Sequence, residues 1–527
     1  MSFAEHLPIL PVAIPALAAP LALLAMRRRR ALGVGIAIVS CLSLLACALG
    51  LMAQVSGGTI LVYALGEWPA PFGIVLVADR LAALMLVLTA ALSLIALLHA
   101  VVTGADRKGR HFHPLFQFLL MGLNGAFLTG DLFNLFVFFE VLLIASYGLM
   151  LHGQGPARLK AGVQYVVVNL VGSSVFLIAL GLLYALTGTL NMADMGLRVA
   201  EVAPADQGLL RIAGLLLVSV FALKAAVAPL HLWLPRTYAV TTPAVAALFA
   251  ILTKVGVYAI IRVVPQVFGE GAGAAAWVPA PYLLPAAMVS AVIGFAGVFA
   301  ARSLSEQAAY AVIGSTGTLL IAVAGWSAAS LGAGLYYLAH STLAAAALFL
   351  VADVVARRRG SYGDVASPGP VFAGRSGIGL LFMAAAIAAT GLPPLSGFIG
   401  KLLILKSVAA LPDWRWAWGV ILGTTLIGVI GFARVGSAVF WKSVEGESPQ
   451  ARASAPALGL ALALGPAPAP ARAPASRADL IAPALALALL AALSIGAGWA
   501  SGYTDAAAAQ VLDPAESARA VLKEAVR

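Results

Sequence analysis

Charged residues are scarce in this sequence. Only 10% of the 527 residues are Asp, Glu, Lys or Arg, whereas 62% are hydrophobic and the mean hydropathy is +1.00. Soluble domains carry about 25% charged residues, so this composition excludes a soluble globular protein. Apolar runs long enough to cross a hydrocarbon layer of about 30 Å as helices recur along nearly the whole chain. We therefore expect an all-α polytopic membrane protein.

Cysteine is scarce, and nucleotide-binding motifs are missing. Cys41 and Cys47 lie in one apolar segment, which leaves no ligand set for an iron–sulfur cluster or a cysteine-rich zinc site. The sequence has neither GxxxxGK[ST] nor a GxGxxG that follows a strand, so ATP hydrolysis and dinucleotide chemistry have no recognisable site. We expect no cofactor, no metal and no enzymatic activity. Energy would then come from an ion gradient or from a partner protein.

About fourteen segments have the length and composition of membrane-spanning helices. Their predicted ranges are 8–26, 32–54, 77–103, 114–130, 132–151, 162–186, 209–228, 243–264, 281–301, 308–326, 331–355, 376–411 with an interruption, 414–440 and 479–500. Basic residues concentrate in every second connection, beginning with Arg27 to Arg30, and the positive-inside rule makes these connections cytoplasmic. This pattern accounts for the net charge of +11 without nucleic acid. It predicts that both termini lie on the outer (periplasmic) face of a bacterial inner membrane.

Four ionisable side chains interrupt the apolar segments: Glu140, Lys224, Lys254 and Lys401. Each costs about 2.5–3.5 kcal/mol at a helix centre on insertion scales, so each is a candidate functional residue. Pairing of Glu140 with Lys224 would form a coupled proton site with a charged and a neutralised state. The alternative is a buried ion pair that fixes helix packing. An unperturbed histidine titrates near neutral pH, so His340 could connect proton sites, or it could be a hydrogen-bonded core residue.

Two helices are predicted to be broken by proline. The segment "KAAVAPLHLWLPRTY" places Pro229 and His231 shortly after Lys224, and "ATGLPPLSGFIGK" places Pro393 and Pro394 before Lys401. Proline frees backbone carbonyls, and such breaks are tolerated where they line a polar cavity. The breaks fall in the seventh and twelfth spans, so they have opposite membrane orientations. This spacing predicts two inverted five-helix repeats with a site in each.

The chain divides into five predicted regions. They are 1–113 with helices 1–3, 114–264 with the first repeat, 281–440 with the second repeat, an Ala/Pro-rich linker at 445–478, and the last helix and tail at 479–527. In the tail, Asp513 is predicted to cap a helix whose first residue is Pro514.

Residues 75–440 resemble the proton-antiporter-like membrane subunits. The segments "NLFVFFEVLLIASYGLM", "LPRTYAVTTP" and "GLPPLSGFIGKLLIL" are most similar to the D-type subunits of the Mrp-type cation/proton antiporters, which are related to the antiporter-like subunits of complex I. The resemblance implies fourteen helices, Glu140 and Lys224 as a coupled pair, Lys254 as a central relay and Lys401 as the distal lysine. It also implies other Mrp subunits, protons, a monovalent cation that we expect to be Na⁺, and membrane lipid as partners, but no nucleic acid.

The sequence departs from the pattern of this family in its second half. Members usually carry a lysine four or five residues after the histidine that corresponds to His340, whereas Ala344 and Ala345 stand here. Ser305 and Glu306 likewise replace expected basic residues. Three functions are compatible with these residues: a proton-translocating antiporter subunit, a proton-pumping subunit of a redox-driven complex, and a scaffold without transport.

Overall fold

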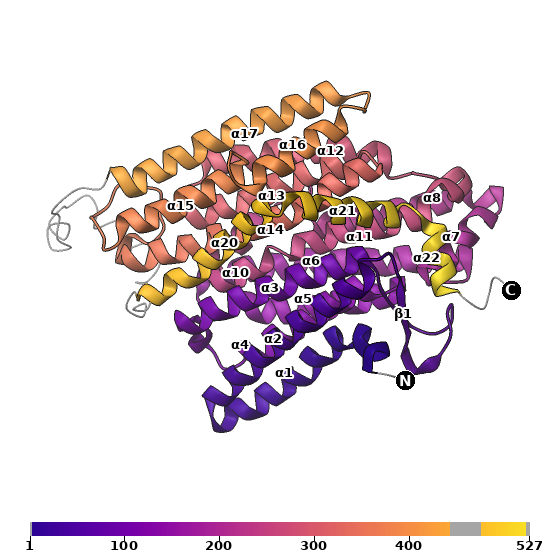
Figure 1. Cartoon of the computed structure of the whole chain (residues 1–527), viewed down its shortest axis with the longest axis horizontal. Coiled ribbons are helices and arrows are strands. Elements are labelled where there is room, and N and C mark those ends of the chain that lie inside the picture. Colours follow the sequence, from indigo (N-terminus) through magenta and orange to yellow (C-terminus); the bar gives the residue numbers. More distant parts are fainter. Residues whose placement is uncertain (1–2, 443–475, 523–527) are drawn as a thin grey trace.

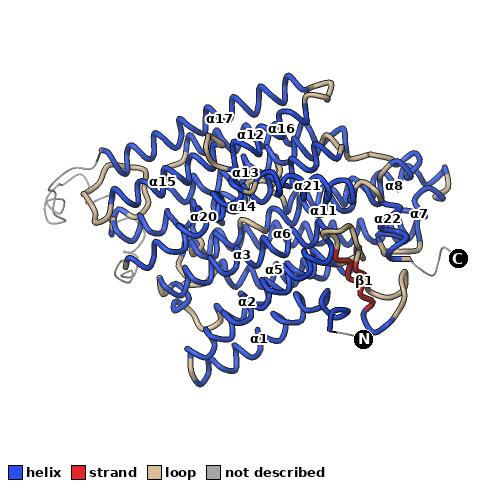
Figure 2. Tube along the Cα trace, in the orientation of Figure 1, coloured by secondary structure: helices blue, strands red, loops and turns tan. Residues whose placement is uncertain are grey.

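The computed structural model describes residues 3–442 and 476–522, and most of this part of the chain is helical. The long helices run in a common direction, and most loops lie at the two ends of the bundle (Figures 1 and 2). In the described ranges, eleven helices are long and apolar enough to cross a membrane, and further apolar helices are shorter. The all-α polytopic fold is therefore confirmed, whereas the count of fourteen spans stays a prediction.

The N-terminal part consists of helices and one small sheet. Its elements are η1 Phe3–Ile9, α1 Leu10–Arg28, α2 Arg30–Val55, β1 Leu61–Ala64, β2 Val75–Ala78 and α3 Arg80–Val102. The two strands pair antiparallel. The prediction that a helix begins at residue 77 is wrong, because β2 occupies that position. α3 begins after Asp79, whose side chain accepts a hydrogen bond from the backbone N–H of Ala82 at 2.8 Å and so caps the helix.

The first predicted repeat contains the first broken helix. The elements are α4 Phe112–Leu128, α5 Leu132–Met150, α6 Pro156–Thr187, α7 Met192–Arg198, α8 Gln207–Lys224, α9 Leu234–Val240, α10 Pro243–Phe249 and α11 Leu252–Phe268. The chain is non-helical between α8 and α9, as the prolines predict. A second interruption between α10 and α11, within the predicted span 243–264, was not predicted. Its residues, Ala250 and Ile251, are apolar and give no turn signal.

The second predicted repeat contains the other broken helix. Its elements are α12 Ala280–Ala300, α13 Leu304–Val323, α14 Ala328–Arg358, α15 Arg375–Thr390, α16 Ser396–Val408 and α17 Trp414–Gly436, which continues as a π-helical turn, Ser437–Trp441. The break between α15 and α16 contains Pro393 and Pro394, as predicted. The span of α10 and α11 is entirely buried, and α14 is buried almost throughout, so these helices form the core of the bundle. The inverted relation of the two repeats stays a prediction.

The last helices cross the bundle. The predicted span 479–500 is divided at Gly496 into α20 Ile481–Ile495 and α21 Ala497–Val511, and α22 Pro514–Val521 follows. Both α20 and α21 pack against α3 and α14, so they connect the two halves of the molecule (Figure 1). Asp513 caps α22, and Pro514 is its first residue, as predicted. Residues 445–475 of the predicted linker 445–478 lie outside the described residues.

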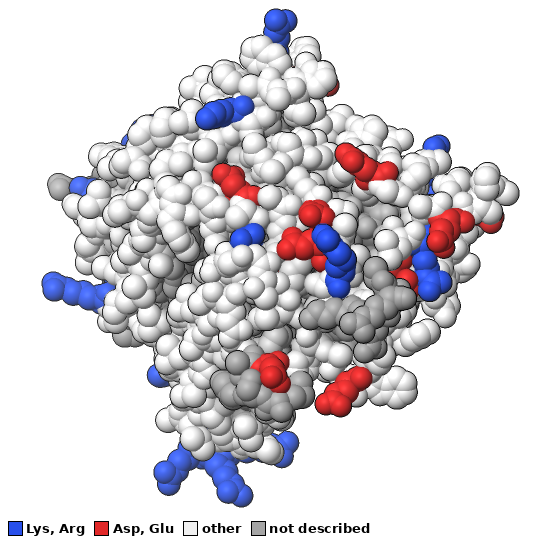
Figure 3. Space-filling view, turned by 45° about the vertical axis from the view of Figure 1, so that its right-hand side comes forward, with Lys and Arg blue, Asp and Glu red and all other residues white. Residues whose placement is uncertain are grey.

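The two ends of the bundle differ in charge. The β-hairpin packs against α22 at one end, where η1 also lies (Figure 1). Figure 3 brings this end forward and shows Asp and Glu side chains on it, whereas Lys and Arg are concentrated toward the rim. The turn that carries Arg27 to Arg30 lies at the opposite end of α1. Which end faces the cytoplasm stays a prediction.

Candidate ion-translocation site

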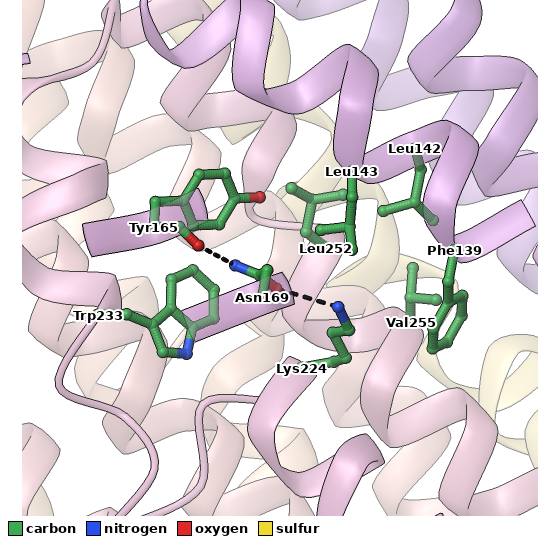
Figure 4. A pocket seen from close by; sticks show the side chains of 9 residues that line it. All are labelled: Phe139, Leu142, Leu143, Tyr165, Asn169, Lys224, Trp233, Leu252 and Val255. Carbon is green, nitrogen blue, oxygen red and sulfur yellow. Dashed lines mark hydrogen bonds between the residues drawn. The ribbon is translucent and has the colours of Figure 1, made fainter. Parts of the chain in front are cut away.

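Lys224 ends α8 at the first helix break and faces a small cavity. Its Nζ donates a hydrogen bond to Oδ1 of Asn169 on α6 at 3.1 Å, and the Asn169 amide nitrogen donates to the Tyr165 carbonyl at 2.8 Å (Figure 4). The cavity measures about 20 Å³ and is otherwise lined mainly by apolar and aromatic side chains, including Trp233. This volume is sufficient for one water molecule. The break therefore places an ammonium group beside a polar void inside an apolar bundle.

Glu140 forms no ion pair with Lys224 in the part of the chain that the structure describes. It lies half-buried on α5, and its Oε1 accepts a hydrogen bond from the hydroxyl of Ser173 on α6. Ser173 is four residues after Asn169, so both side chains lie on the same face of α6. Within the described residues, Glu140 and Lys224 form no ion pair and instead bind neighbouring groups of one helix. The coupling of Glu140 with Lys224 stays a prediction.

Lys254 lies in the most deeply buried part of the chain. Its Nζ donates to Oγ1 of Thr316 on α13 at 3.1 Å. The interruption between α10 and α11 lies just before it, and there the carbonyl of Phe249 accepts a hydrogen bond from the Tyr238 hydroxyl at 2.8 Å. Lys254 therefore connects the first predicted repeat to a hydroxyl of the second.

Lys401 lies on α16, and its ammonium group reaches back to the second helix break. Its Nζ donates to the carbonyl of Thr390, the last residue of α15, at 2.8 Å and to Oγ1 of Thr425 on α17 at 2.6 Å. It also lies 5.2 Å from the centre of the Phe295 ring. Lys406, in the same helix, is exposed, so Lys401 is the buried lysine of this span.

His340 contacts both sides of the same break. Its Nδ1 is 2.9 Å from Oγ of Ser396, the first residue of α16, and its Nε2 is 3.1 Å from the carbonyl of Ala388 in the last turn of α15. Carbonyls at the end of α15 therefore bind His340 and Lys401, as expected where a helix is interrupted. Ala345 is buried one turn further along α14, in the place where the resemblance predicts a lysine.

The prolines predicted to shape the breaks do interrupt the helices, but none of them lines the cavity beside Lys224. Pro229, Pro393 and Pro394 are exposed, so they interrupt the helices without lining the polar sites. His231 is buried, but it does not line the cavity beside Lys224, and its Nδ1 has no hydrogen-bond partner.

Sequence reasoning missed the neutral partners of the charged residues. They are Asn169, Ser173, Thr316, Thr390 and Thr425. Single polar residues inside apolar segments were the available signal, but which of them meets a lysine depends on helix packing. No group of three or more His, Cys, Asp or Glu side chains in the described ranges could hold a metal ion.

Comparisons with known proteins agree on one family. Residues 129–429 match the family described as NADH:quinone oxidoreductase/Mrp antiporter, transmembrane. The chain is 42% identical over 484 residues to the D-type subunit of a probable K⁺/H⁺ antiporter of Rhizobium meliloti, covering 85% of this chain and 89% of that protein. It is 34% identical over 519 residues to the D-type subunit of a Na⁺/H⁺ antiporter of Bacillus subtilis, covering 98% and 99%.

Solved structures give the same result. A chain of the Mrp complex from Dietzia sp. DQ12-45-1b superposes with a TM-score of 0.84 and 30% identity, covering 99% of this chain and 100% of that chain. A chain of an archaeal membrane-bound sulfane sulfur reductase shares the fold, with a TM-score of 0.85 and 22% identity over 98% of this chain and 100% of that chain. The chain therefore belongs to the NADH:quinone oxidoreductase/Mrp antiporter family of transmembrane subunits.

Proposed function

We propose that this chain is the proton-translocating D-type subunit of a multisubunit monovalent cation/proton antiporter. The observation that carries the proposal is the environment of the three buried lysines, Lys224, Lys254 and Lys401. They are 7%, 1% and 5% exposed, and each ammonium group donates to neutral oxygen atoms. No carboxylate in the described residues forms an ion pair with any of them.

Neutral partners are suited to proton transfer. A buried lysine held by a carboxylate is fixed in its charged form, whereas burial without an opposite charge favours loss of the proton. Hydrogen bonds to an amide, a hydroxyl or a carbonyl orient the ammonium group without fixing its charge. The three lysines can therefore alternate between charged and neutral states at low cost, which a purely structural ion pair could not do.

Helix α6 supplies the coupling in this proposal. Ser173 binds Glu140 and Asn169 binds Lys224, so a change of charge at one end of this face alters the field at the other. Release of a proton from Lys224 would favour proton uptake by Lys254, whose helix also lines the Lys224 cavity through Val255. The proton would then pass toward His340 and Lys401 at the second break.

The proposed partner subunits and the proposed cation are inferred from the names of the relatives. The Mrp complex of Dietzia and the names of the two D-type relatives support other Mrp-type subunits as partners in a hetero-oligomer. The sequence interpretation favoured Na⁺, and the Bacillus relative is named for Na⁺, whereas the Rhizobium relative is named for K⁺. We propose a monovalent cation as substrate, and the experiment below compares the two ions. A bacterial inner membrane with both termini outside remains part of the proposal.

The second candidate is a proton-pumping subunit of a redox-driven complex. The fold it shares with the sulfane sulfur reductase and with complex I of Thermus thermophilus favours it. In both cases the polar groups of this chain would carry protons, but the energy source would differ. Exchange that strictly requires an electron donor, together with co-purified flavin or iron–sulfur proteins, would identify the redox-driven complex.

The decisive test is cation-dependent proton exchange in everted vesicles that contain the whole assembly. When this subunit is present, addition of Na⁺ or K⁺ should collapse a preformed ΔpH. This collapse should not require an electron donor. Omission of this subunit should abolish the collapse. An assembly that exchanges ions equally well without this subunit would contradict the proposal.

A further inference from the structure

A basic groove lies at the end of the bundle that carries the α1–α2 turn, far from the helix breaks. It has a volume of about 710 Å³ and separates this turn from the segment between α3 and α4. Five cationic side chains and one carboxylate line it: Arg27, Arg30, Arg107, Lys108, Arg110 and Asp106. Lys and Arg side chains also project at the lower edge of the molecule in Figure 3. A groove with this excess of cations attracts anions.

The carboxylate offsets only one of the five cations of the groove, because its ion pair within the groove is with Arg30. Asp106 is fully buried and accepts hydrogen bonds from Arg30 and from Nε2 of His113, the latter at 3.0 Å. Burial alone would raise the pKa of Asp106, but the hydrogen bonds from His113 and Arg30 outweigh it and hold the pKa below its ordinary value. Asp106 therefore fixes the floor of the groove while Arg27, Arg107 and Arg110 stay exposed above it.

The groove also has an apolar side. Leu23 and Met26 of α1 line it, and the same helix exposes Leu17, Leu21 and Leu24 along its length, by 65%, 54% and 58%. α1 is long and apolar enough to cross a membrane, so its exposed leucines face the hydrocarbon layer, and Leu23 and Met26 give the groove an apolar wall beside the arginines. A free inorganic anion would gain nothing from such a surface, whereas a phospholipid would cover it with its acyl chains.

We propose that this groove binds an anionic phospholipid of the phosphatidylglycerol class. The headgroup phosphate lies between Arg27 and Arg107, and an acyl chain packs against Leu23 and Met26 of α1. Basic pockets at the ends of membrane helices recognise anionic headgroups in this way. The site is separate from the buried lysines, so it is independent of the ion-exchange proposal.

The chain offers a matched control for its own test. Arg27 lines the groove, whereas Arg28 and Arg29 of the same turn are also exposed but do not line it. The two variants to compare are Arg27→Gln with Arg107→Gln, and Arg28→Gln with Arg29→Gln. Both remove two positive charges from one end of the molecule, so they change its long-range field equally and differ only in the groove.

The experiment titrates the purified assembly in detergent micelles with fluorescent phosphatidylglycerol and with fluorescent phosphatidylcholine. The wild-type assembly should bind phosphatidylglycerol more tightly than phosphatidylcholine. The groove variant should lose about fivefold in affinity for each removed arginine, or about twenty-fivefold for two. The control variant should bind as wild type does. Unchanged melting temperatures and elution volumes verify folding, and Arg110→Gln provides a second groove variant with about a fivefold loss.

Three outcomes would overturn the proposal. Equal losses in the two double variants would show that only diffuse surface charge attracts the lipid. Displacement of the lipid by inorganic phosphate at equal concentration would show that the groove recognises the phosphate group alone. Absence of phosphatidylglycerol binding to the assembled complex would show that a partner protein covers the groove.

Discussion

Close packing of α8 against α11 sets the distance between the Lys224 and Lys254 helices, and Gly256 makes it possible. A Cβ atom at this position would lie 2.5 Å from the Ala225 nitrogen and 2.6 Å from the Phe221 carbonyl oxygen. Ordinary van der Waals contact begins at 3.4 Å, so Gly256→Ala forces the two helices apart by about 0.9 Å, because backbone atoms cannot rotate away.

The magnitude of this perturbation follows from its geometry. Overpacking of this kind costs about 1–3 kcal/mol of stability. A displacement of about 1 Å between reacting groups can cost up to about a hundredfold in rate, so we expect at least a tenfold loss of cation-dependent proton exchange in Gly256→Ala. No charged group is removed, so any loss reports on distance rather than on titration.

The measurement combines thermal unfolding with exchange assays in everted vesicles. Gly181→Ala is the control, because this glycine also lies inside a helix, α6, and a Cβ atom there meets nothing within 4 Å. It should leave exchange unchanged and stabilise the helix by about 0.5–1 kcal/mol. If Gly256→Ala is as stable and as active as Gly181→Ala, the spacing of α8 and α11 does not control transport.

Three further predictions concern single side chains. Lys401→Ala should abolish exchange while Lys406→Ala, in the same helix but exposed, should retain it in the same vesicle assay; equal activity would remove Lys401 from the pathway. Ser173→Ala removes a hydrogen bond to the Glu140 carboxylate, which is worth about 1.5–3 kcal/mol, and should slow exchange about tenfold. Ser174→Ala, on the exposed side of α6, should leave the exchange rate unchanged. Asp106→Asn should lower the melting temperature at pH 7, because a carboxylate with a depressed pKa stabilises the fold above its unfolded pKa of about 3.9. This stabilisation disappears as the pH falls through the folded pKa, so a difference from wild type that does not shrink in acid would refute the assignment.

The sequence predicts the architecture well because hydropathy and proline act locally. Long apolar runs can only be membrane helices, and the prolines near Lys224 and Lys401 interrupt theirs at the predicted places. Asp513 and Pro514 begin α22 for the same local reason. In contrast, the interruption before Lys254 contains neither proline nor glycine, so no local signal in the sequence predicts it.

The site is predicted only in part. Burial of the three lysines follows from their apolar surroundings, and the structure places all three inside the bundle. The partners of these lysines could not be predicted, because they come from other helices whose rotation is set by packing. Glu140 and Lys224 illustrate the difference: opposite charges suggest a direct pair, but Ser173 and Asn169 lie on the facing helix and take their hydrogen bonds.

The central claim is that Glu140 and Lys224 act together, through α6, to move protons along the buried lysines. The most direct measurement is Na⁺- and K⁺-induced collapse of ΔpH in everted vesicles that carry the whole assembly with Glu140→Ala or Lys224→Ala in this subunit. Each substitution should abolish exchange while the assembly still forms. Exchange at the wild-type rate in either variant would contradict this mechanism.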